Sequence, residues 1–169
     1  HRVTVDGLLG GHSGAEIDKE RGNAICILGR VMKELEEAGL SIALCNIDGG
    51  LKDNAIPRQA EAVIVCPEKR QSEINTKIAV ISSEIKHEFL ETDPMILVEA
   101  KKTTLVEKEL VMTKDSADKV ITALLCLPGG IQKMSFQMKG LVKTSLNLGI
   151  MKTERDHFSL SFSVRSSVE

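Results

Sequence analysis

His12, in the segment Gly10-Gly11-His12-Ser13-Gly14, is the side chain of this sequence best placed to do chemistry. The alternating residues before it predict a strand that breaks on glycines, and the residues after it predict a helix. The first turn of a helix has free backbone N–H groups, so a histidine held there is well placed to meet a negatively charged oxygen. A histidine that only shapes the strand–helix turn is the alternative interpretation.

Ser13, the next residue, has a hydroxyl that could serve as a nucleophile. It is followed three residues later by Glu16, and a Ser-x-x-Glu spacing is typical of a capping box at the start of a helix. The sequence has neither the Gly-x-Ser-x-Gly turn of serine hydrolases nor a phosphate-binding Gly-x-x-x-x-Gly-Lys loop. We therefore expect Ser13 to cap the helix, and a small standalone hydrolase that uses Ser13 remains as an alternative.

The possible metal ligands show no zinc-binding spacing. The four histidines lack a His-x-Asp or His-Glu-x-x-His pattern, and a hydrolytic zinc site needs several ligands that converge. The four cysteines lack a Cys-x-x-Cys pair and fall within apolar stretches, which predicts reduced, buried thiols in a cytoplasmic protein. These residues are His1, His12, His87 and His157, and Cys26, Cys45, Cys66 and Cys126. We expect no metal site and no self-contained active site in this chain.

Composition and charge exclude several classes of function. A formal net charge of −2 provides no positive field for nucleic acid, and an aromatic content of 2% leaves few surfaces on which bases could stack. No apolar run approaches the roughly 20 residues that a membrane span needs, and no signal peptide is visible. With 169 residues, 42% of them hydrophobic, the chain can bury the core of one domain or of two closely packed halves.

The first half of the chain alternates strand and helix patterns in the order β-α-β-β-α-β. This order predicts an α+β, ferredoxin-like sandwich over residues 1–101, with an antiparallel sheet and helices on one face. The helix that follows Ser13 is expected to end at about Ala38, before Gly39. The expected strands are 2–8, 41–47, 61–66 and 95–100, and the expected helices are 13–38 and 68–89.

The second half, residues 102–169, begins the same order again and predicts a partial second unit. Its last strand has a clear alternation, which predicts that Phe158, Leu160, Phe162 and Val164 point inward. The expected elements are a strand at 105–112, a helix at 115–127, and strands at 141–151 and 157–165. A final helix and strand would be missing, so we expect this chain to be a piece of a longer protein.

Three ordered motifs carry a family resemblance. The first runs from Gly7 to Asp18 and continues through Arg21 and Asn23-Ala24. The second is the segment 49–60, and the third combines Thr144–Gly149 with Ser163–Ser167. Together they resemble the lid or dimerisation domain of aminoacyl-histidine dipeptidases, which are carnosinase-like dinuclear zinc peptidases. The resemblance extends over essentially the whole chain.

The resemblance implies a division of labour between two domains. A catalytic domain, absent here, supplies two zinc ions, a bridging water and a glutamate base. The lid closes over the dipeptide, and His12 matches the histidine that donates a hydrogen bond to the developing oxyanion. Asn54 matches an asparagine that contacts the substrate, and Arg165 matches an arginine that holds the substrate's C-terminal carboxylate with two parallel bonds. Asn147 is a weaker substrate-binding match, near a hinge with Gly149.

Each of these matches has a simpler alternative. Asn54 could be a turn residue before the Pro57 strand, and Arg165 an exposed strand arginine with no partner. The resemblance nevertheless implies the lid of a cytosolic zinc dipeptidase that hydrolyses Xaa-His and related dipeptides. The implied partners are the dipeptide, the parent catalytic domain and possibly a second copy of the chain, and the isolated chain is expected to be inactive. The competing prediction is a non-catalytic ferredoxin-like module for dimerisation or small-molecule binding, in which His12 would be dispensable.

Overall fold

The computed structural model describes residues 1–103 and 110–167. In this part of the chain, seven strands form one sheet in the order β6-β1-β5-β3-β8-β7, with β9 on β8. These strands are β1 (Arg2–Asp6), β3 (Ala43–Gly49), β5 (Ala60–Val65), β6 (Leu97–Lys101), β7 (Gly130–Met134), β8 (Val142–Thr153) and β9 (Phe158–Ser166). The helices are α1 (Ala24–Glu37), α2 (Gln71–Glu88) and α3 (Lys114–Cys126). Two short strands, β2 (Gly11–His12) and β4 (Ala55–Ile56), pair separately, and 3-10 turns span Ile17–Lys19 and Glu68–Arg70.

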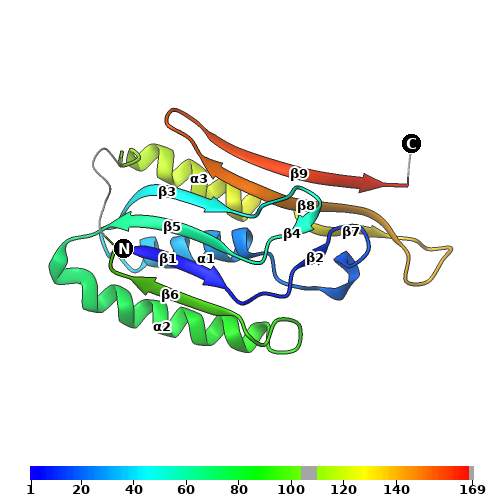
Figure 1. Cartoon of the computed structure of the whole chain (residues 1–169), viewed down its shortest axis with the longest axis horizontal. Helices are drawn as coiled ribbons and strands as arrows, with labels where there is room; N and C mark the ends of the chain where they lie inside the picture. The colour runs from blue at the N-terminus through cyan, green and yellow to red at the C-terminus, as the bar shows by residue number, and fades with distance from the viewer. Residues whose placement is uncertain (104–109, 168–169) are drawn as a thin grey trace.

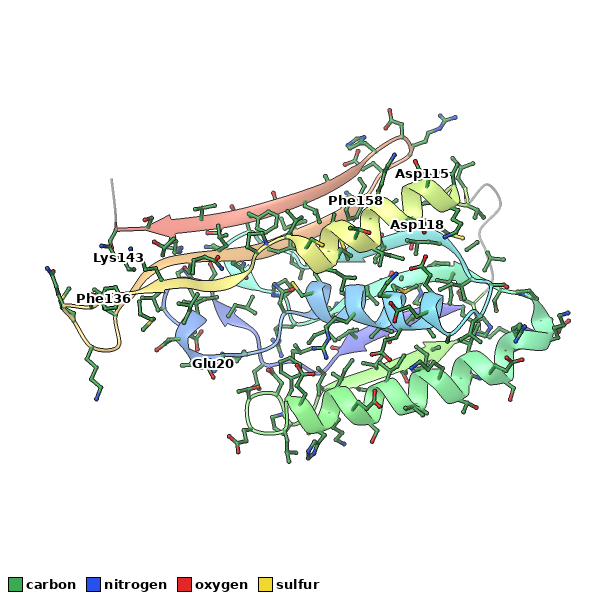
Figure 2. The ribbon with its side chains drawn as sticks, turned by 180° about the vertical axis from the view of Figure 1, so that it is seen from behind. Glu20, Asp115, Asp118, Phe136, Lys143 and Phe158 are labelled. Carbon is green, nitrogen blue, oxygen red and sulfur yellow. The ribbon has the colours of Figure 1, made fainter. Side chains whose placement is uncertain are left out.

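The first half has the predicted ferredoxin-like arrangement. Strand β1 pairs antiparallel with both β5 and β6, and β5 pairs antiparallel with β3. Helices α1, α2 and α3 cover one face of the sheet, as Figures 1 and 2 show from opposite sides. The prediction of an antiparallel α+β fold with helices on one face is therefore confirmed. Within the described residues, no helix combines the length and the apolar character that crossing a membrane requires.

The core lies between the sheet and the helices. On β1, Val3 and Val5 are 0% exposed, whereas Arg2 and Asp6 on the opposite face are exposed. Each helix adds a buried stripe at helical spacing, which is how an amphipathic helix packs on a sheet. The largest contributions are Ile25, Leu28, Met32 and Leu35 from α1, Ile74, Ile78, Ile81 and Ile85 from α2, and Val120, Ile121 and Leu124 from α3.

The prediction that the first helix begins at Ser13 is wrong, because α1 begins at Ala24. Its N-cap is Asn23, whose side-chain oxygen accepts from the N–H groups of Ile25 and Cys26. The Ser13 N–H instead donates to the Asn54 carbonyl at 2.9 Å, a long-range bond that draws the segment away from a helical path. The Ser13 hydroxyl is buried and has no hydrogen-bond partner among the described residues, so it caps no helix.

The second half agrees with expectation in α3, β8 and β9, but β7 was not foreseen. Of the strand expected at 105–112, residues 105–109 lie outside the described residues and 110–112 are not in a strand. The inward alternation holds for Phe158, Leu160 and Phe162, which pack against the core. It fails for Val164, which is 64% exposed, because this end of β9 runs past the end of α3 (Figure 1).

Gly29 provides a test of how closely α1 packs on α3. A Cβ built there would lie only 2.8 Å from the Cβ of Leu124, which cannot swing away because it is attached to the α3 backbone. Alanine favours a helix by about 1 kcal/mol over glycine, but overpacking costs about 1–3 kcal/mol. We expect Gly29→Ala to lower the free energy of unfolding by about 1 kcal/mol in urea denaturation.

Ser83→Ala is the matched control, because Ser83 is exposed on α2 and the change only raises helix propensity. It should alter the free energy of unfolding by less than about 0.5 kcal/mol. A Gly29→Ala protein more stable than the Ser83→Ala protein would contradict the close approach of the two helices.

Candidate functional site

His12 lies on β2, which pairs antiparallel with β4 so that His12 is opposite Ala55. The glycines before it are needed for this path, since Gly10 has φ +61° and Gly11 has φ +147°. A Cβ on Gly11 would also lie 2.8 Å from side-chain atoms of both Arg21 and Glu16. The two glycines thus allow the chain to turn and leave space for the Arg21 and Glu16 side chains beside it.

The His12 ring is held by the backbone that follows it. Its Nδ1 accepts hydrogen bonds from the N–H groups of Gly14 at 3.2 Å and Ala15 at 3.1 Å. An imidazole nitrogen that accepts carries no proton, so we assign the proton of the neutral ring to Nε2. Because the side chain is exposed, this arrangement presents an Nε2–H donor to whatever lies outside the chain.

The Glu16 carboxylate stabilises the turn that follows His12 by accepting three hydrogen bonds. It accepts from the His12 N–H at 2.9 Å, from Lys19 Nζ at 2.7 Å and from Arg21 Nη1 at 3.2 Å. The hydrogen bond from Lys19, followed by that from the His12 N–H, lowers the pKa of Glu16 from 4.5 to about 2. Arg21 also donates to the Gly10 carbonyl, so the same ion pair braces the segment on both sides of His12.

Asn54 and Asn147 occupy two sides of the same loop. Asn54 is exposed immediately before β4, and its carbonyl accepts the Ser13 N–H. Asn147, on β8, is 3% exposed and donates its Nδ2 hydrogens to the carbonyls of Asp53 at 2.8 Å and Ala55 at 2.9 Å. These bonds fix the residues on either side of Asn54. They also use both Asn147 donors, so direct contact of these donors with a substrate would require the loop to move.

Arg165, on β9, lies against the histidine segment. A Cβ built on Gly14 would lie 2.8 Å from both Nε and Cζ of Arg165, so glycine leaves the space that the guanidinium fills. Arg165 is exposed, and among residues 1–103 and 110–167 no carboxylate lies within ion-pair distance of it. The structure therefore brings together the segments that carry the four residues selected by the resemblance, which are His12, Asn54, Asn147 and Arg165.

Comparison with known proteins identifies the family to which this chain belongs. The sequence profile of the peptidase dimerisation domain matches residues 3–93. The chain belongs to this family. The peptidase dimerisation domain described here is also 29% identical over 168 residues to the cytosol non-specific dipeptidase of Escherichia coli K12. That match covers 99% of this chain and 34% of the relative.

A solved structure is similar over the same extent. The crystal structure of an aminoacylhistidine dipeptidase from Vibrio alginolyticus superposes with a TM-score of 0.92 at 29% identity. The match again covers 99% of this chain and 34% of the other, so this dimerisation domain spans about a third of the length of both relatives. The resemblance to the dimerisation domain of a dipeptidase is confirmed.

The domain does not provide a metal-ligand set in its described part. No three His, Cys, Asp or Glu side chains converge there. His87 lies on α2 and His157 follows β8, and neither forms a group of possible metal ligands with His12. Of the cysteines only Cys45 is buried, and Cys126 is exposed in the last turn of α3, contrary to the prediction of buried thiols. The His, Cys, Asp and Glu side chains of residues 1–103 and 110–167 therefore do not fit a zinc centre.

The sequence indicates the exposed residues of the candidate site, but not the residues whose hydrogen bonds hold the backbone around them. Asn23 was noted only as part of the resemblance, although an asparagine after Gly22 and before an apolar helix is an N-cap signal. Glu16 was assigned to a helix cap, whereas its carboxylate in fact receives the His12 N–H. No sequence pattern indicated that Asn147 would hold Asp53 and Ala55, because the two segments are more than 90 residues apart.

The depressed pKa of Glu16 gives the turn a defined pH dependence. A carboxyl whose folded pKa is about 2 and whose ordinary pKa is 4.5 stabilises the folded turn fully above pH 4.5. This contribution is lost as the pH falls from 4.5 through about 2. We expect the amide resonance of His12 to titrate with a midpoint near pH 2, measured by two-dimensional NMR.

Glu16→Gln is the control, because the amide cannot titrate and the low-pH change at His12 should disappear. A midpoint near the ordinary value of 4.5 would mean that the bonds from Lys19 and the His12 N–H do not hold the carboxylate in solution.

Proposed function

We propose that this dimerisation domain is the lid of a cytosolic, zinc-dependent dipeptidase that hydrolyses Xaa-His and related dipeptides. In this proposal the lid contributes the oxyanion hydrogen bond and the contacts to the substrate carboxylate, and the isolated chain is inactive. The observation that carries the proposal is the exposed His12 ring, oriented by two backbone N–H groups and bordered by Arg165 through Gly14.

His12 suits the role of an oxyanion donor. Because Nδ1 accepts hydrogen bonds from the N–H groups of Gly14 and Ala15, Nε2–H is the free donor of the ring. The backbone N–H of His12 is itself held by the Glu16 carboxylate. A donor oriented before the reaction needs no reorganisation when charge develops on the scissile carbonyl oxygen. Such a donor favours the transition state over the bound substrate, so its effect belongs mainly in kcat.

Arg165 and Asn54 suit the recognition of a dipeptide's polar ends. A guanidinium without a carboxylate partner in the described residues can bind the C-terminal carboxylate of a substrate with two parallel bonds. The Asn54 amide can donate to a carboxylate or accept from an amine. We assign Asn147 to holding the Asn54 loop, because its amide already bonds Asp53 and Ala55.

The remaining parts of the proposed enzyme lie outside this chain. In this proposal the two zinc ions, which would activate water, and the glutamate base come from a catalytic domain outside this chain. A location in the cytosol is supported by the name of the Escherichia coli relative. A homodimer formed through this domain is supported by the family that it matches.

That family description also favours a second candidate, a domain that serves dimerisation alone. The two candidates differ at His12, which the second leaves without a function. The standalone hydrolase that uses Ser13 has no support, because Ser13 is 2% exposed and thus not accessible to a substrate.

Replacing His12 tests the proposed oxyanion role in the full-length dipeptidase. We expect His12→Ala to lower kcat by about 10²–10³-fold, the usual cost of losing one oxyanion donor, while KM changes little. The measurement is steady-state hydrolysis of an Xaa-His dipeptide. His87→Ala is the matched control, an exposed histidine on α2 whose loss should change neither constant. If His12→Ala weakened binding and left kcat unchanged, the oxyanion role would be wrong.

Gly14→Ala tests whether the position of the Arg165 guanidinium beside Gly14 is needed to bind the substrate carboxylate. The added methyl group would occupy space within 2.8 Å of the guanidinium, which must then shift. We expect KM for a free dipeptide to rise about tenfold, because one charged hydrogen bond is worth roughly 1.5–3 kcal/mol. The same dipeptide with an amidated C-terminus should show no change.

Gly129→Ala is the matched control, since a Cβ at Gly129 meets nothing within 4 Å. An equal rise in KM for the free and the amidated dipeptide would show that Gly14 does not act through carboxylate binding.

A further inference from the structure

We infer that Asp93 is a positioning residue for His12, which it serves by tying together both ends of the segment Leu9–Gly22. The inference rests on the proposed function in so far as His12 acts in catalysis. Asp93 lies in the connection between α2 and β6, and it belongs to none of the motifs that carry the family resemblance.

Asp93 makes one bond to each end of the histidine segment. Its Oδ1 accepts the N–H of Leu9 at 2.8 Å, and its Oδ2 accepts the N–H of Gly22 at 2.8 Å. The side chain is 0% exposed, so water does not compete for these oxygens. One buried carboxylate therefore closes a loop whose two ends are 13 residues apart in the sequence (22 minus 9).

The carboxylate is itself held in place. The Asp93 N–H donates to the Phe89 carbonyl at 2.8 Å, and the Asp93 carbonyl accepts the Ile96 N–H at 3.0 Å. These bonds join it to the end of α2 and to the turn before β6. Phe89 also approaches Gly22, where an added Cβ would lie 3.1 Å from its ring. Asp93 thus links the histidine segment to the rigid edge of the domain.

Only a carboxylate satisfies both ends at once. Asparagine has one acceptor oxygen, and its NH₂ group would face a backbone N–H, which is also a donor. Among the described residues no Lys, Arg or His lies within ion-pair distance of Asp93. The role of the side chain is therefore the two backbone bonds, and a neutral isostere removes one of them with little change in volume.

The two bonds to Asp93 limit the conformations that the residues around His12 can adopt. Between them, Glu16 holds the His12 N–H and Ser13 is bonded to Asn54. Releasing one end lets the ring sample orientations in which Nε2–H no longer points to the reacting oxygen, which costs preorganisation. Arg165 is on β9 and makes no bond to Asp93, so binding of the substrate carboxylate should be unaffected.

A double-mutant cycle in the full-length dipeptidase tests this assignment. We expect Asp93→Asn to lower kcat about tenfold, because a less firmly held His12 ring loses part of its stabilisation of the developing oxyanion, and to change KM less than about twofold. In a His12→Ala background the same change should have no further effect on kcat, because Asp93 acts through His12. Asp115→Asn, at an exposed position on α3, is the matched control and should leave kcat unchanged.

Hydrogen exchange in the same variants provides a readout that does not depend on activity. In Asp93→Asn the amide of Leu9 or of Gly22, whichever faces the NH₂ group, should exchange faster, while those of Val3 and Val5 in β1 keep their protection. A second variant replaces Leu9 by its α-hydroxy acid analogue, which removes that N–H and leaves the buried carboxylate in place. It should lower kcat in the same direction, and it decides the question if Asp93→Asn does not fold.

Three results would count against parts of this assignment, and they are distinguishable. An Asp93→Asn effect that persists in the His12→Ala background would overturn the positioning role, since the residue would then act elsewhere. Unchanged hydrogen exchange at both Leu9 and Gly22 would show that Asp93 does not hold the two ends of the segment. If His12→Ala alone left kcat unchanged, the oxyanion function would fall, and exchange at Leu9 and Gly22 would by itself decide whether Asp93 holds the segment.

Discussion

The site depends on hydrogen bonds that cross from β8 to the first half of the chain. Asn147 donates to the carbonyls of Asp53 and Ala55, and the Leu148 carbonyl accepts from the Asn23 side chain. The first contact fixes the loop before β4, and the second reaches the residue that caps α1. Because β9 pairs along β8, these bonds also determine where Arg165 lies relative to His12. They act together with the pairing of β8 on β3 and the packing of α3 on α1, which also hold the second half of the chain in place.

Glycine makes this close approach possible at two points, Gly149 on β8 and Gly50 just after β3. A Cβ on Gly149 would lie 2.4 Å from the Asp53 carbonyl oxygen, and one on Gly50 would lie 1.9 Å from the Gly149 oxygen. These backbones therefore touch without side chains between them. These contacts add to the apolar core that the two halves share, which includes Leu28 and Met32 of α1 and Ile121 and Leu124 of α3.

The polar groups that hold the His12 segment extend from the interior of the domain to its surface. Asp93 holds the ends of the segment in the interior, Glu16 holds its middle at the surface, and the backbone N–H groups of Gly14 and Ala15 orient the ring. Each layer satisfies donors that would otherwise lack partners, which is why an irregular segment can be rigid. The exposed His12, Asn54 and Arg165 side chains are what remains free to meet another molecule.

The sequence by itself determined most of the helices and strands and the exposed polar residues. Periodic apolar positions specified α2, α3 and the central strands, because a 3.6- or 2-residue repeat depends only on neighbouring residues. The first motif likewise contained His12. The tertiary structure decided where α1 begins, since the bond from Ser13 to Asn54 outweighs a local capping box. It also decided that Asn147 and Asp93 support the site, because their partners are 71 to 94 residues away and no local pattern records such contacts.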